Sequence, residues 1–588
     1  MRRVTGIAAA ALIGLLATGA PVAGAAVPAP PPKVAVVTAP KVTTGSPCNP
    51  RRVTTCALPY PNNRWTRTDP TSATGLRVNV PDSLIPADVL SQFPATMKPL
   101  QNLNSADGFS AAGPIVFEVA RAAAPESLPV DGGNVIAVFD ADTGVRIPVR
   151  TRFDTEGEKR GAPNTTIFVW PRSRFPWGHH LVAALTTALK PASGAPFVPS
   201  RGMQTLLRQS GLGVWTFLAG HGIARSNVLS VTDFTTRSQA NATDPLVNMI
   251  ATTNQQTHPI RNVATLPNFL GLANIDTIVT GQIQLTDFRD ENGEIHYHTG
   301  DQGHLEWVDF VMTEPTVTPK AGAPVAVYGH GIGIFKETLI IVAPTNAAHG
   351  VATIAIDQPN HGGRAAAEGG QVFDLTTPKG LGKLFGMVVQ SSVDQASVLR
   401  AVQTSLANLD AGPWKLFQTT LGDGQRDLDP TRLFYEGTSL GGVLGAATVS
   451  LSPELDGAAL QVSGVGVLHD ITETFFWEHG LNQSGVGFRA VIPSSATAGQ
   501  DAFLIAAAQQ LVDIGDAVNF VDRIPTHRTP VLVPYAIDDG TVDNQSTEAL
   551  AELAQLPVIG KVLRPLPFLP KSTTVPDSGI VQISTSTI

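Results

Sequence analysis

The sequence has little charge and no long uninterrupted hydrophobic segment in its interior. Only 15% of its 588 residues are charged and the net charge is -8, with lysine and arginine scattered rather than clustered. Because nucleic-acid binding depends on a concentrated basic surface, this pattern argues against a nucleic-acid partner. Beyond the amino terminus, no apolar run reaches the roughly 20 residues of a spanning helix without charge, glycine or proline. We therefore expect no transmembrane segment in the mature chain.

The amino terminus has the features of an export signal. Arg2-Arg3 supplies positive charge, residues 7–21 are apolar, and Ala23-Gly24-Ala25 offers small residues for cleavage. We therefore expect a signal peptide at residues 1–25 and a secreted or cell-envelope location. Residues 26–47 are rich in proline, valine, alanine and threonine, a composition that favours an extended linker.

Cysteine is also scarce, since Cys48 and Cys56 are the only two in the chain. Two thiolates cannot complete the tetrahedral shell of a zinc site, and in an exported protein a nearby pair favours a local disulfide. We therefore expect a disulfide between these residues, with two free thiols as the alternative.

The remaining composition is that of a globular protein with more than one domain. Apolar residues make up 43% of the 588, enough to bury cores larger than one ordinary domain contains. Residues 48–237 contain short apolar runs separated by turn residues, a spacing typical of β-sandwiches. We expect a β-rich amino-terminal domain there, an all-β sandwich for which an immunoglobulin-like arrangement is one option. Its clearest expected strands are residues 135–139, 145–149, 166–170 and 181–185.

The expected pattern of secondary structure changes after a polar, partly helical connecting segment at residues 238–274. From residue 275 onward, expected strands alternate with helical stretches, which is typical of parallel strands joined by helical crossovers. The sequence therefore predicts an α/β domain over residues 275–588. Its expected strands are residues 283–288, 307–312, 324–328, 351–356, 432–435, 458–462, 530–535 and 579–584, and its expected helices are residues 388–409, 442–451, 503–512 and 546–554.

One short motif in this domain indicates a catalytic nucleophile. Gly437-Thr438-Ser439-Leu440-Gly441 follows an expected strand and precedes an expected helix. A nucleophile on a strained strand-to-helix turn needs small residues two positions to either side, and Gly437 and Gly441 meet that need. The sequence therefore predicts that Ser439 is a nucleophile.

A second loop has the features of an oxyanion hole. The expected strand at residues 324–328 leads directly into Gly329-His330-Gly331-Ile332-Gly333. Acyl transfer builds negative charge on a carbonyl oxygen, and one backbone N–H aimed at that oxygen supplies roughly 3 to 4 kcal/mol. We expect the amides of Ile332 and Leu440 to be these donors.

A carboxylate follows the expected strand at residues 530–535. The segment Ala536-Ile537-Asp538-Asp539-Gly540-Thr541-Val542 puts it at the carboxyl end of a strand, where ligands gather in α/β sheets. Asp539 fits an Asp-x-x-Val pattern and is the expected catalytic acid, with Asp538 as the alternative. A turn-forming aspartate before glycine is the competing interpretation.

These motifs resemble the α/β-hydrolase superfamily, and the whole mature chain is similar to bacterial exported lipase-like and esterase-like proteins with a β-rich amino-terminal region. The resemblance implies an α/β-hydrolase fold over residues 275–588, with a cap insertion at about residues 466–525. The matching segments are Asn62-Asn63-Arg64-Trp65 within residues 56–81, Asp107-Gly108-Phe109-Ser110, His330-Gly331-Ile332-Gly333, Asp357-Gln358-Pro359-Asn360-His361-Gly362 and the motif around Ser439.

The resemblance also implies a histidine after the acid, because the superfamily's triad runs serine, acid, histidine along the chain. No histidine follows Asp539 in this sequence. The catalytic histidine is therefore unknown. We expect it either to lie beyond Ile588 in a longer chain, which we favour, or to be absent from a pseudoenzyme. Less favoured substitutes are His330, expected to be structural, and His361, His469 and His479.

Two further features of the α/β domain have alternative interpretations. His296, His298 and His304 lie at spacings that can share one face of a strand, but no carboxylate frame of known spacing accompanies them, so solvent-facing strand histidines are favoured over a metal site. The cap insertion contains Phe475-Phe476-Trp477 and an apolar helix at residues 503–512, which can form a lid or pack on the sheet.

Together these features predict a secreted serine hydrolase that cleaves carboxylic esters of small molecules or lipids through an acyl-enzyme, with Ser439 and Asp539 as catalytic residues. No metal or organic cofactor is expected. The alternatives are a non-catalytic cell-surface binding protein on a degenerate hydrolase scaffold, and an acyltransferase.

Overall fold

The computed structural model describes residues 48–92, 99–159, 161–209, 212–297, 299–367, 378–414, 422–475, 477, 492, 496–572 and 576–584. The expected signal peptide and linker, as well as His298 and His479, lie outside these residues. Across the ranges given, no helix combines the length and apolar character needed to cross a membrane.

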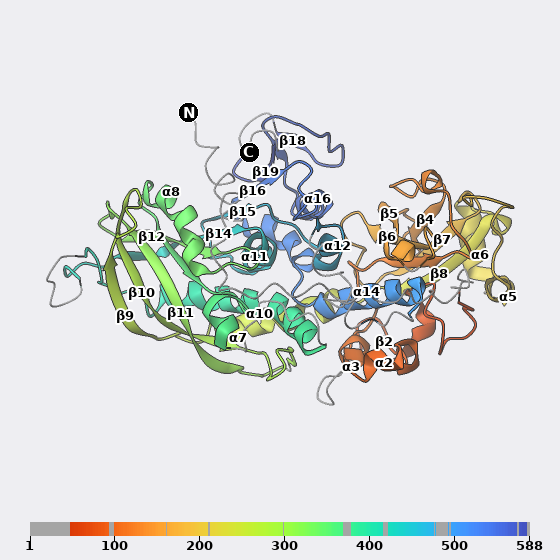
Figure 1. The fold of residues 1–588 in the computed structure, drawn as a ribbon, viewed down its shortest axis with the longest axis horizontal. Helices are drawn as coiled ribbons and strands as arrows, with labels where there is room; N and C mark the ends of the chain where they lie inside the picture. Colours follow the sequence, from red (N-terminus) through yellow and green to blue (C-terminus); the bar gives the residue numbers. More distant parts are fainter. Residues whose placement is uncertain are drawn as a thin grey trace, which may run out of the picture.

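The carboxyl-terminal half is built around one large sheet, seen at the left and top of Figure 1. In the described part of the chain it has eleven strands in the order β18-β17-β19-β16-β15-β14-β12-β13-β11-β10-β9. All neighbours from β18 to β13 are parallel, whereas β9, β10 and β11 are antiparallel. The predicted mostly parallel sheet is therefore confirmed. The strands are β9 Ile260–Pro267, β10 Ile275–Asp287, β11 His304–Pro315, β12 Ala323–Gly329, β13 Ala352–Ile356, β14 Leu428–Thr438, β15 Gly457–Gln461, β16 Val531–Ala536, β17 Val558–Ile559, β18 Lys571–Ser572 and β19 Gly579–Ile583.

Helices cover both faces of this sheet, which explains why its central strands are apolar throughout. Successive strand residues point to opposite faces. Val327 therefore packs in the cluster formed with α10 and α11, while Tyr328 packs with α8 on the other face. The α-helices among the described residues are α2 Ala87–Leu90, α3 Pro99–Asn104, α4 Glu156–Lys159, α5 Arg201–Gln209, α6 Leu212–Gly220, α7 Gln239–Thr253, α8 Ala343–Ala347, α9 Gly362–Ala367, α10 Pro378–Gln403, α11 Leu440–Leu451, α12 Val467–Thr472, α14 Ala498–Val512, α15 Ile524–His527 and α16 Asn544–Leu553.

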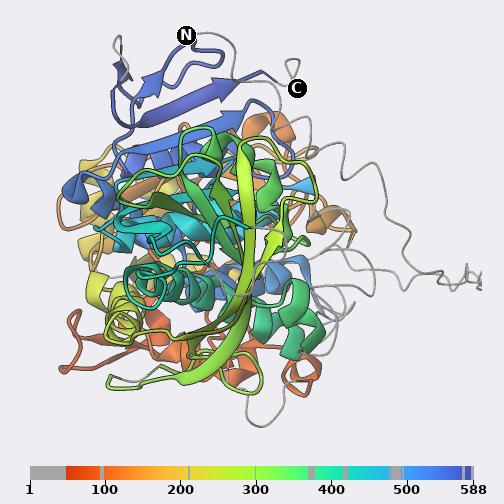
Figure 2. The ribbon, with the colours of Figure 1, turned by 90° about the vertical axis from the view of Figure 1, so that its left-hand side faces the viewer.

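The long antiparallel strands extend well past their parallel neighbours, as Figure 2 shows from the left-hand side of Figure 1. The connecting segment at residues 238–274 contributes to this end of the sheet. It contains the expected helix, α7, but also β9, which pairs with β10. The segment is therefore part of the sheet rather than a simple connection between domains.

The amino-terminal half contains two three-stranded antiparallel sheets, with orders β3-β6-β5 and β4-β7-β8. Phe117 and Phe168 from the first sheet share one buried core with Val138 and Leu181 from the second. The prediction of packed β-sheets in this region is confirmed. The strands are β1 Thr66–Thr68, β2 Leu76–Val78, β3 Ile115–Glu118, β4 Ile136–Asp140, β5 Val149–Phe153, β6 Thr166–Pro171, β7 His180–Thr186 and β8 Val228–Thr235.

The same region differs from an all-β sandwich in one respect. Helices α5 and α6 cover the outer face of the second sheet, where Trp215 and Leu218 pack with Phe139 and Val182. The sequence did not indicate α6 because its residues are apolar all round and lack a helical hydrophobic period. The domain is β-rich with a helical layer. The strand expected at residues 145–149 begins only at Val149, after the turn at residues 141–144.

Helix α14, from the cap insertion, packs between the two halves, as Figure 1 shows. Its Phe503 ring lies 5.2 Å from the Tyr60 ring. Just after the helix, Asp513 accepts a hydrogen bond from Ser110 Oγ at 2.8 Å and pairs with Arg237 at 3.2 Å. The helix is therefore a packing element that joins the insertion to the amino-terminal sheets, and the lid interpretation of α14 is wrong.

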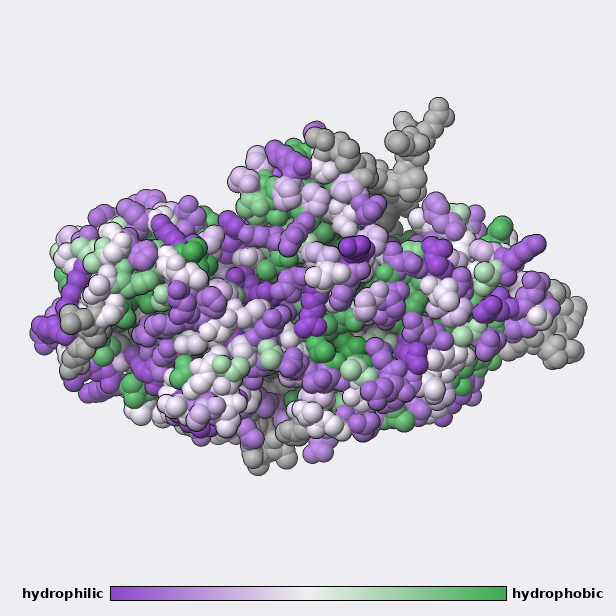
Figure 3. Space-filling model, turned by 180° about the vertical axis from the view of Figure 1, so that it is seen from behind, coloured by the Kyte–Doolittle hydropathy of each residue, from purple (hydrophilic) through white to green (hydrophobic). Residues whose placement is uncertain are grey.

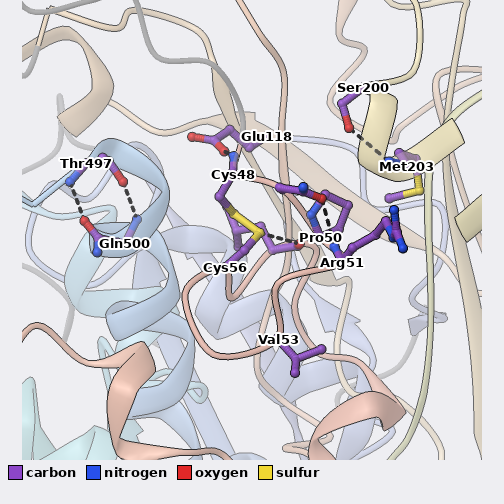
Figure 4. The surroundings of a disulfide bond; sticks show 12 residues. Cys48, Pro50, Arg51, Val53, Cys56, Glu118, Ser200, Met203, Thr497 and Gln500 are labelled. Atoms are coloured by element: carbon purple, nitrogen blue, oxygen red, sulfur yellow. Dashed lines mark hydrogen bonds between the residues drawn. A yellow bond between two sulfur atoms is a disulfide. The ribbon is translucent and has the colours of Figure 1, made fainter. Parts of the chain in front are cut away.

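The disulfide predicted from the cysteine pair is present between Cys48 and Cys56, with Cα atoms 5.2 Å apart (Figure 4). The Cys48 amide donates to Glu118 Oε2 at 3.0 Å. Burial raises the pKa of Glu118 to about 7. Because Glu118 ends β3, this contact holds the disulfide loop against the first amino-terminal sheet.

A buried glutamate near the end of β11, close to the half-buried Asp427 before β14, gives a testable pH effect. Burial raises the pKa of Glu314 to about 9, and the nearby charge of Asp427 adds to the shift. The folded protein therefore holds a proton that the unfolded chain releases, so this contribution to stability is present at low pH and is lost as pH rises towards 9. We expect Glu314→Gln to raise the free energy of unfolding by about 1 to 3 kcal/mol at pH 8.5 and by less at pH 5.5.

Urea unfolding at these two pH values measures the effect. Glu126→Gln, at an exposed position, is the matched control and should behave like the unmodified protein at both. A gain for Glu314→Gln that is the same at both pH values would contradict the prediction.

Candidate active site

Ser439 lies at the tip of the turn between β14 and α11, in a conformation that few residues adopt. Its φ is 55° and its ψ is -122°. The turn is closed so tightly that a Cβ on Gly437 would lie 2.2 Å from the Gly441 oxygen, and a Cβ on Gly441 would lie 2.0 Å from the Gly329 oxygen. Only glycine fits at both positions, which explains the spacing of the motif. Ser439 is partly exposed, and its amide donates to Gln461 O at the end of β15.

The loop after β12 lies beside Ser439. A Cβ on Gly331 would be 3.6 Å from the Ser439 Cβ. The next residue, Ile332, is half-buried in a turn. The amides of Ile332 and Leu440 donate to no acceptor among the described residues. Both N–H groups are therefore available to a bound oxygen.

This loop is held in place by the segment that follows β13. His330 Nε2 accepts a hydrogen bond from the Gln358 amide at 3.0 Å. Asp357 accepts from the Lys336 amide at 2.8 Å and pairs with Lys336 Nζ at 3.0 Å. Burial alone would raise the pKa of Asp357, but the hydrogen bonds from Lys336 and Gly363 and the Lys336 charge lower it. An ionised Asp357 thus fixes the far end of the loop.

Asp539 lies in the turn after β16, at the same edge of the sheet as Ser439. Its Oδ1 accepts from the Thr541 amide at 2.8 Å and from the Thr541 hydroxyl at 2.6 Å. Asp538 is exposed and has a positive φ of 60°. The turn also lies beside the end of β19, because the Ile537 amide donates to Ile583 O at 2.9 Å. Within the described chain, the side chains of Ser439 and Asp539 are not in contact.

A serine in a strained turn that follows a central parallel strand and precedes a helix is characteristic of the α/β-hydrolase fold. The carboxyl-terminal half has the α/β-hydrolase fold. The parallel order of the strands around β14 and the helices on both faces agree with it.

Comparisons with known proteins give distant matches among solved structures. No protein-family model matches the chain, and no curated protein matches it. Among solved structures, an acetyl xylan esterase from a Paenibacillus species is 15% identical, with 58% of this chain and 85% of that chain covered and a TM-score of 0.34. Acetyl xylan esterase 1 from a Thermoanaerobacterium species is 12% identical, with 58% and 88% covered and a TM-score of 0.33. An acylaminoacyl peptidase from Pyrococcus horikoshii is 10% identical, with 54% and 38% covered and a TM-score of 0.29.

The buried histidines of this α/β-hydrolase half have structural partners. His330 Nδ1 donates to Gly331 O at 2.9 Å while Nε2 accepts from Gln358, so both ring nitrogens are occupied. Burial lowers the pKa of His330 to about 4. His361 Nδ1 donates to Pro359 O at 2.9 Å. Both rings fix the loops around the site.

His469 does not face the acid either. Its ring stacks on Trp170 of β6, with ring centres 4.7 Å apart. Burial, together with the positive charges of Arg152 and Arg150, lowers its pKa to about 3. In the described ranges, no histidine makes a hydrogen bond or an ion pair with Ser439 or Asp539. The position of the catalytic histidine stays a prediction.

Asp470 is a residue near the acid turn that the sequence did not reveal. Its Oδ1 accepts from the Asp543 amide at 2.7 Å. Burial, together with the charges of Asp543, Asp539 and Asp516, raises the pKa of Asp470 well above its ordinary value. This shift favours the neutral form of the carboxyl that joins α12 to the acid turn. No local pattern could have predicted it, because the contact joins residues 73 positions apart.

The amino-terminal motifs of the resemblance serve packing. Asn62 Nδ2 donates to Thr232 Oγ1 at 3.0 Å, and the Thr235 amide donates to Asn63 Oδ1 at 2.9 Å. These contacts hold the segment before β1 against β8. The segment Asp107-Gly108-Phe109-Ser110 likewise reaches α14 through Gln510, whose Nε2 donates to Gly108 O at 3.3 Å.

Proposed function

We propose that this protein is an exported serine hydrolase that cleaves carboxylic esters. The observation that carries the proposal is the geometry around Ser439, which combines a partly exposed hydroxyl on a strained turn with two amides that have no other acceptor. The hydroxyl attacks the ester carbonyl and forms an acyl-enzyme, which water then cleaves. The amides of Ile332 and Leu440 hold the developing oxyanion, and one such donor contributes roughly 3 to 4 kcal/mol.

Asp539 is the proposed acid, whose role is to orient and stabilise the imidazole that takes the serine proton. Its place after β16, with β15 between it and β14, supports this role. Its second carboxylate oxygen accepts no hydrogen bond from the described residues. It is thus available to an imidazole N–H.

Two exposed aromatic side chains support the proposal that the ester substrates carry an apolar group. Phe335, in the loop after β12, is 49% exposed, and Phe475, whose amide donates to Gly540 O, is 57% exposed. They come from the loops next to the proposed nucleophile and acid. Figure 3 shows the molecule from behind the view of Figure 1, where the surface is mainly hydrophilic with apolar side chains gathered near its middle. Exposed aromatic side chains on the loops beside a reactive serine and its acid suit an acyl chain or an aryl group.

A secreted or cell-envelope location is part of the proposal. The features of residues 1–25 and the Cys48–Cys56 disulfide support it, because disulfides persist in oxidising compartments.

Covalent labelling with a fluorophosphonate tests the proposal. We expect the folded protein to react, and peptide mass spectrometry to locate the phosphonyl group on Ser439, because only an activated serine attacks this probe at a useful rate. Ser439→Ala should abolish labelling. Ser452→Ala, a change at a buried serine after α11, is the matched control and should label like the unmodified protein.

A non-catalytic binding protein on the same scaffold is the second candidate. It is favoured by the lack of a hydrogen bond between Ser439 and any histidine in the part of the chain that the structure describes. Absence of labelling in a full-length chain, including any residues after Ile588, whose circular dichroism and cooperative unfolding show that it is folded would support this candidate and reject the hydrolase.

A further inference from the structure

The loop between β10 and β11 brings three potential metal ligands together. His296 Nε2 lies 3.2 Å from Asp290 Oδ2 and 3.2 Å from Glu294 Oε2. The structure therefore differs from the expectation of solvent-facing strand histidines, because His296 lies in a loop and only His304 begins a strand. A carboxylate frame that the spacing alone did not reveal surrounds His296.

One of these side chains is buried, and outside the cluster no described residue donates to its inward-facing oxygen. Glu294 is only 9% exposed, and its Oε2 accepts no hydrogen bond in the described structure although it faces the His296 ring. A buried carboxylate oxygen beside a second carboxylate is unfavourable unless a cation compensates for it.

We propose that Asp290, Glu294 and His296 bind a divalent transition-metal cation, with Zn²⁺ as the best match. The three ligand atoms lie within 4.8 Å of one another. Ligands about 2.0 to 2.2 Å from a metal are roughly 3 to 3.5 Å apart in tetrahedral or octahedral shells, which agrees with the separations from His296. An imidazole nitrogen favours zinc over calcium, which prefers an all-oxygen shell. Asp290 and His296 are partly exposed, so water can complete the coordination.

A second group of similar composition shows why the first is preferred. Asp140, Asp142 and His179 also lie close together. The Asp140 carboxylate, however, already accepts from the Thr143 hydroxyl at 2.6 Å and from the Asp142 amide at 3.0 Å. The charge of Asp140 is thus compensated by donors outside the histidine, whereas Glu294 Oε2 has only the His296 ring, 3.2 Å away.

A cation bound in this loop would stabilise the contacts that the loop makes with α10 and with the segment after β13. The loop packs on α10, since a Cβ on Gly293 would lie 2.6 Å from Lys383 Cγ. Arg289, at the start of the loop, donates to Asn360 Oδ1 at 3.5 Å. Asn360 belongs to the segment after β13 that also holds His330. The cation is thus a structural one, apart from the Ser439 chemistry.

Isothermal titration of the untagged, chelator-treated full chain with ZnCl₂ tests the site. We expect one Zn²⁺ per chain, and binding weakened by at least about tenfold when a ligand is removed by His296→Ala or Glu294→Gln. His304→Ala removes an exposed histidine nearby and should bind like the unmodified protein. Parallel titrations with CaCl₂ should give weaker binding.

Glu294→Gln keeps the size of the side chain and guards against misfolding, and thermal unfolding without metal confirms that each variant is folded. No saturable Zn²⁺ binding by the unmodified chain would overturn the proposal. So would unchanged affinity in both folded ligand variants, or Ca²⁺ binding tighter than Zn²⁺.

Discussion

Replacement of Ser439 by alanine is expected to lower the hydrolysis rate of an activated aryl ester by at least about 10³-fold. The reason is that the alternative route, direct attack by water, keeps only the stabilisation supplied by the Ile332 and Leu440 amides. The measurement is the initial rate with a chromogenic ester at saturating concentration. A variant that retains more than a tenth of the rate would place the nucleophile elsewhere.

Replacement of the same residue by glycine separates activity from stability. Ser439 has a φ of 55° and a ψ of -122°, a backbone conformation that residues other than glycine adopt only with strain. We expect Ser439→Gly to be as inactive as Ser439→Ala but more stable than it by about 1 to 2 kcal/mol, because glycine relieves the backbone strain that alanine retains.

Urea unfolding of the two variants measures this difference. Ser226→Gly, at an exposed position with an ordinary φ, is the control and should lose about 0.5 to 1 kcal/mol relative to Ser226→Ala. If Ser439→Gly is no more stable than Ser439→Ala, the turn does not store strain, and the cost of positioning the hydroxyl lies elsewhere.

The turn itself was predictable because its constraints are local. The positions of Gly437 and Gly441 follow from clashes within a few residues, and the strands around β14 have apolar runs that read directly as buried elements. The loop with Gly331 was predictable for the same reason, since it directly follows a buried strand.

Features that depend on distant parts of the chain could not be predicted. The apolar sequence of α14 suits a lid as well as a packed helix, and its actual partners lie in β3 and β6, more than 300 residues earlier in the chain. The sequence left His469 open as a possible base. Only the structure reveals that its ring stacks on Trp170. The frame of Asp290 and Glu294 around His296 depends on a loop fold that spacing does not specify.

The buried ion network beside the loop after β13 also depends on distant parts of the chain and could not be predicted. Arg364, in α9, pairs with Asp394 of α10 and with Glu306 of β11, the latter at 2.8 Å, and lies 3.8 Å from Asp287. Arg364 and Asp394 are almost fully buried. Residues from four separate segments thus share one desolvated charge cluster next to the site.

Replacing Arg364 by methionine is expected to lower the free energy of unfolding by about 3 to 5 kcal/mol, because it leaves buried carboxylates without their cation. Burial raises the pKa of Asp394 to about 6 even with Arg364 beside it. Without the arginine this carboxyl is protonated over a wider pH range, so the loss should be larger at pH 8 than at pH 5.

Urea unfolding at both pH values measures the effect, with Arg432→Met as the matched control. Arg432 pairs with Asp456 at 3.0 Å, but the side chains are 53% and 38% exposed, and such surface pairs contribute about 0 to 1 kcal/mol. A loss for Arg364→Met as small as that of the control would contradict the prediction. Because Arg364 also donates to Asp357 O, the same variant should slow ester hydrolysis by loosening the segment that holds the Ile332 loop beside Ser439.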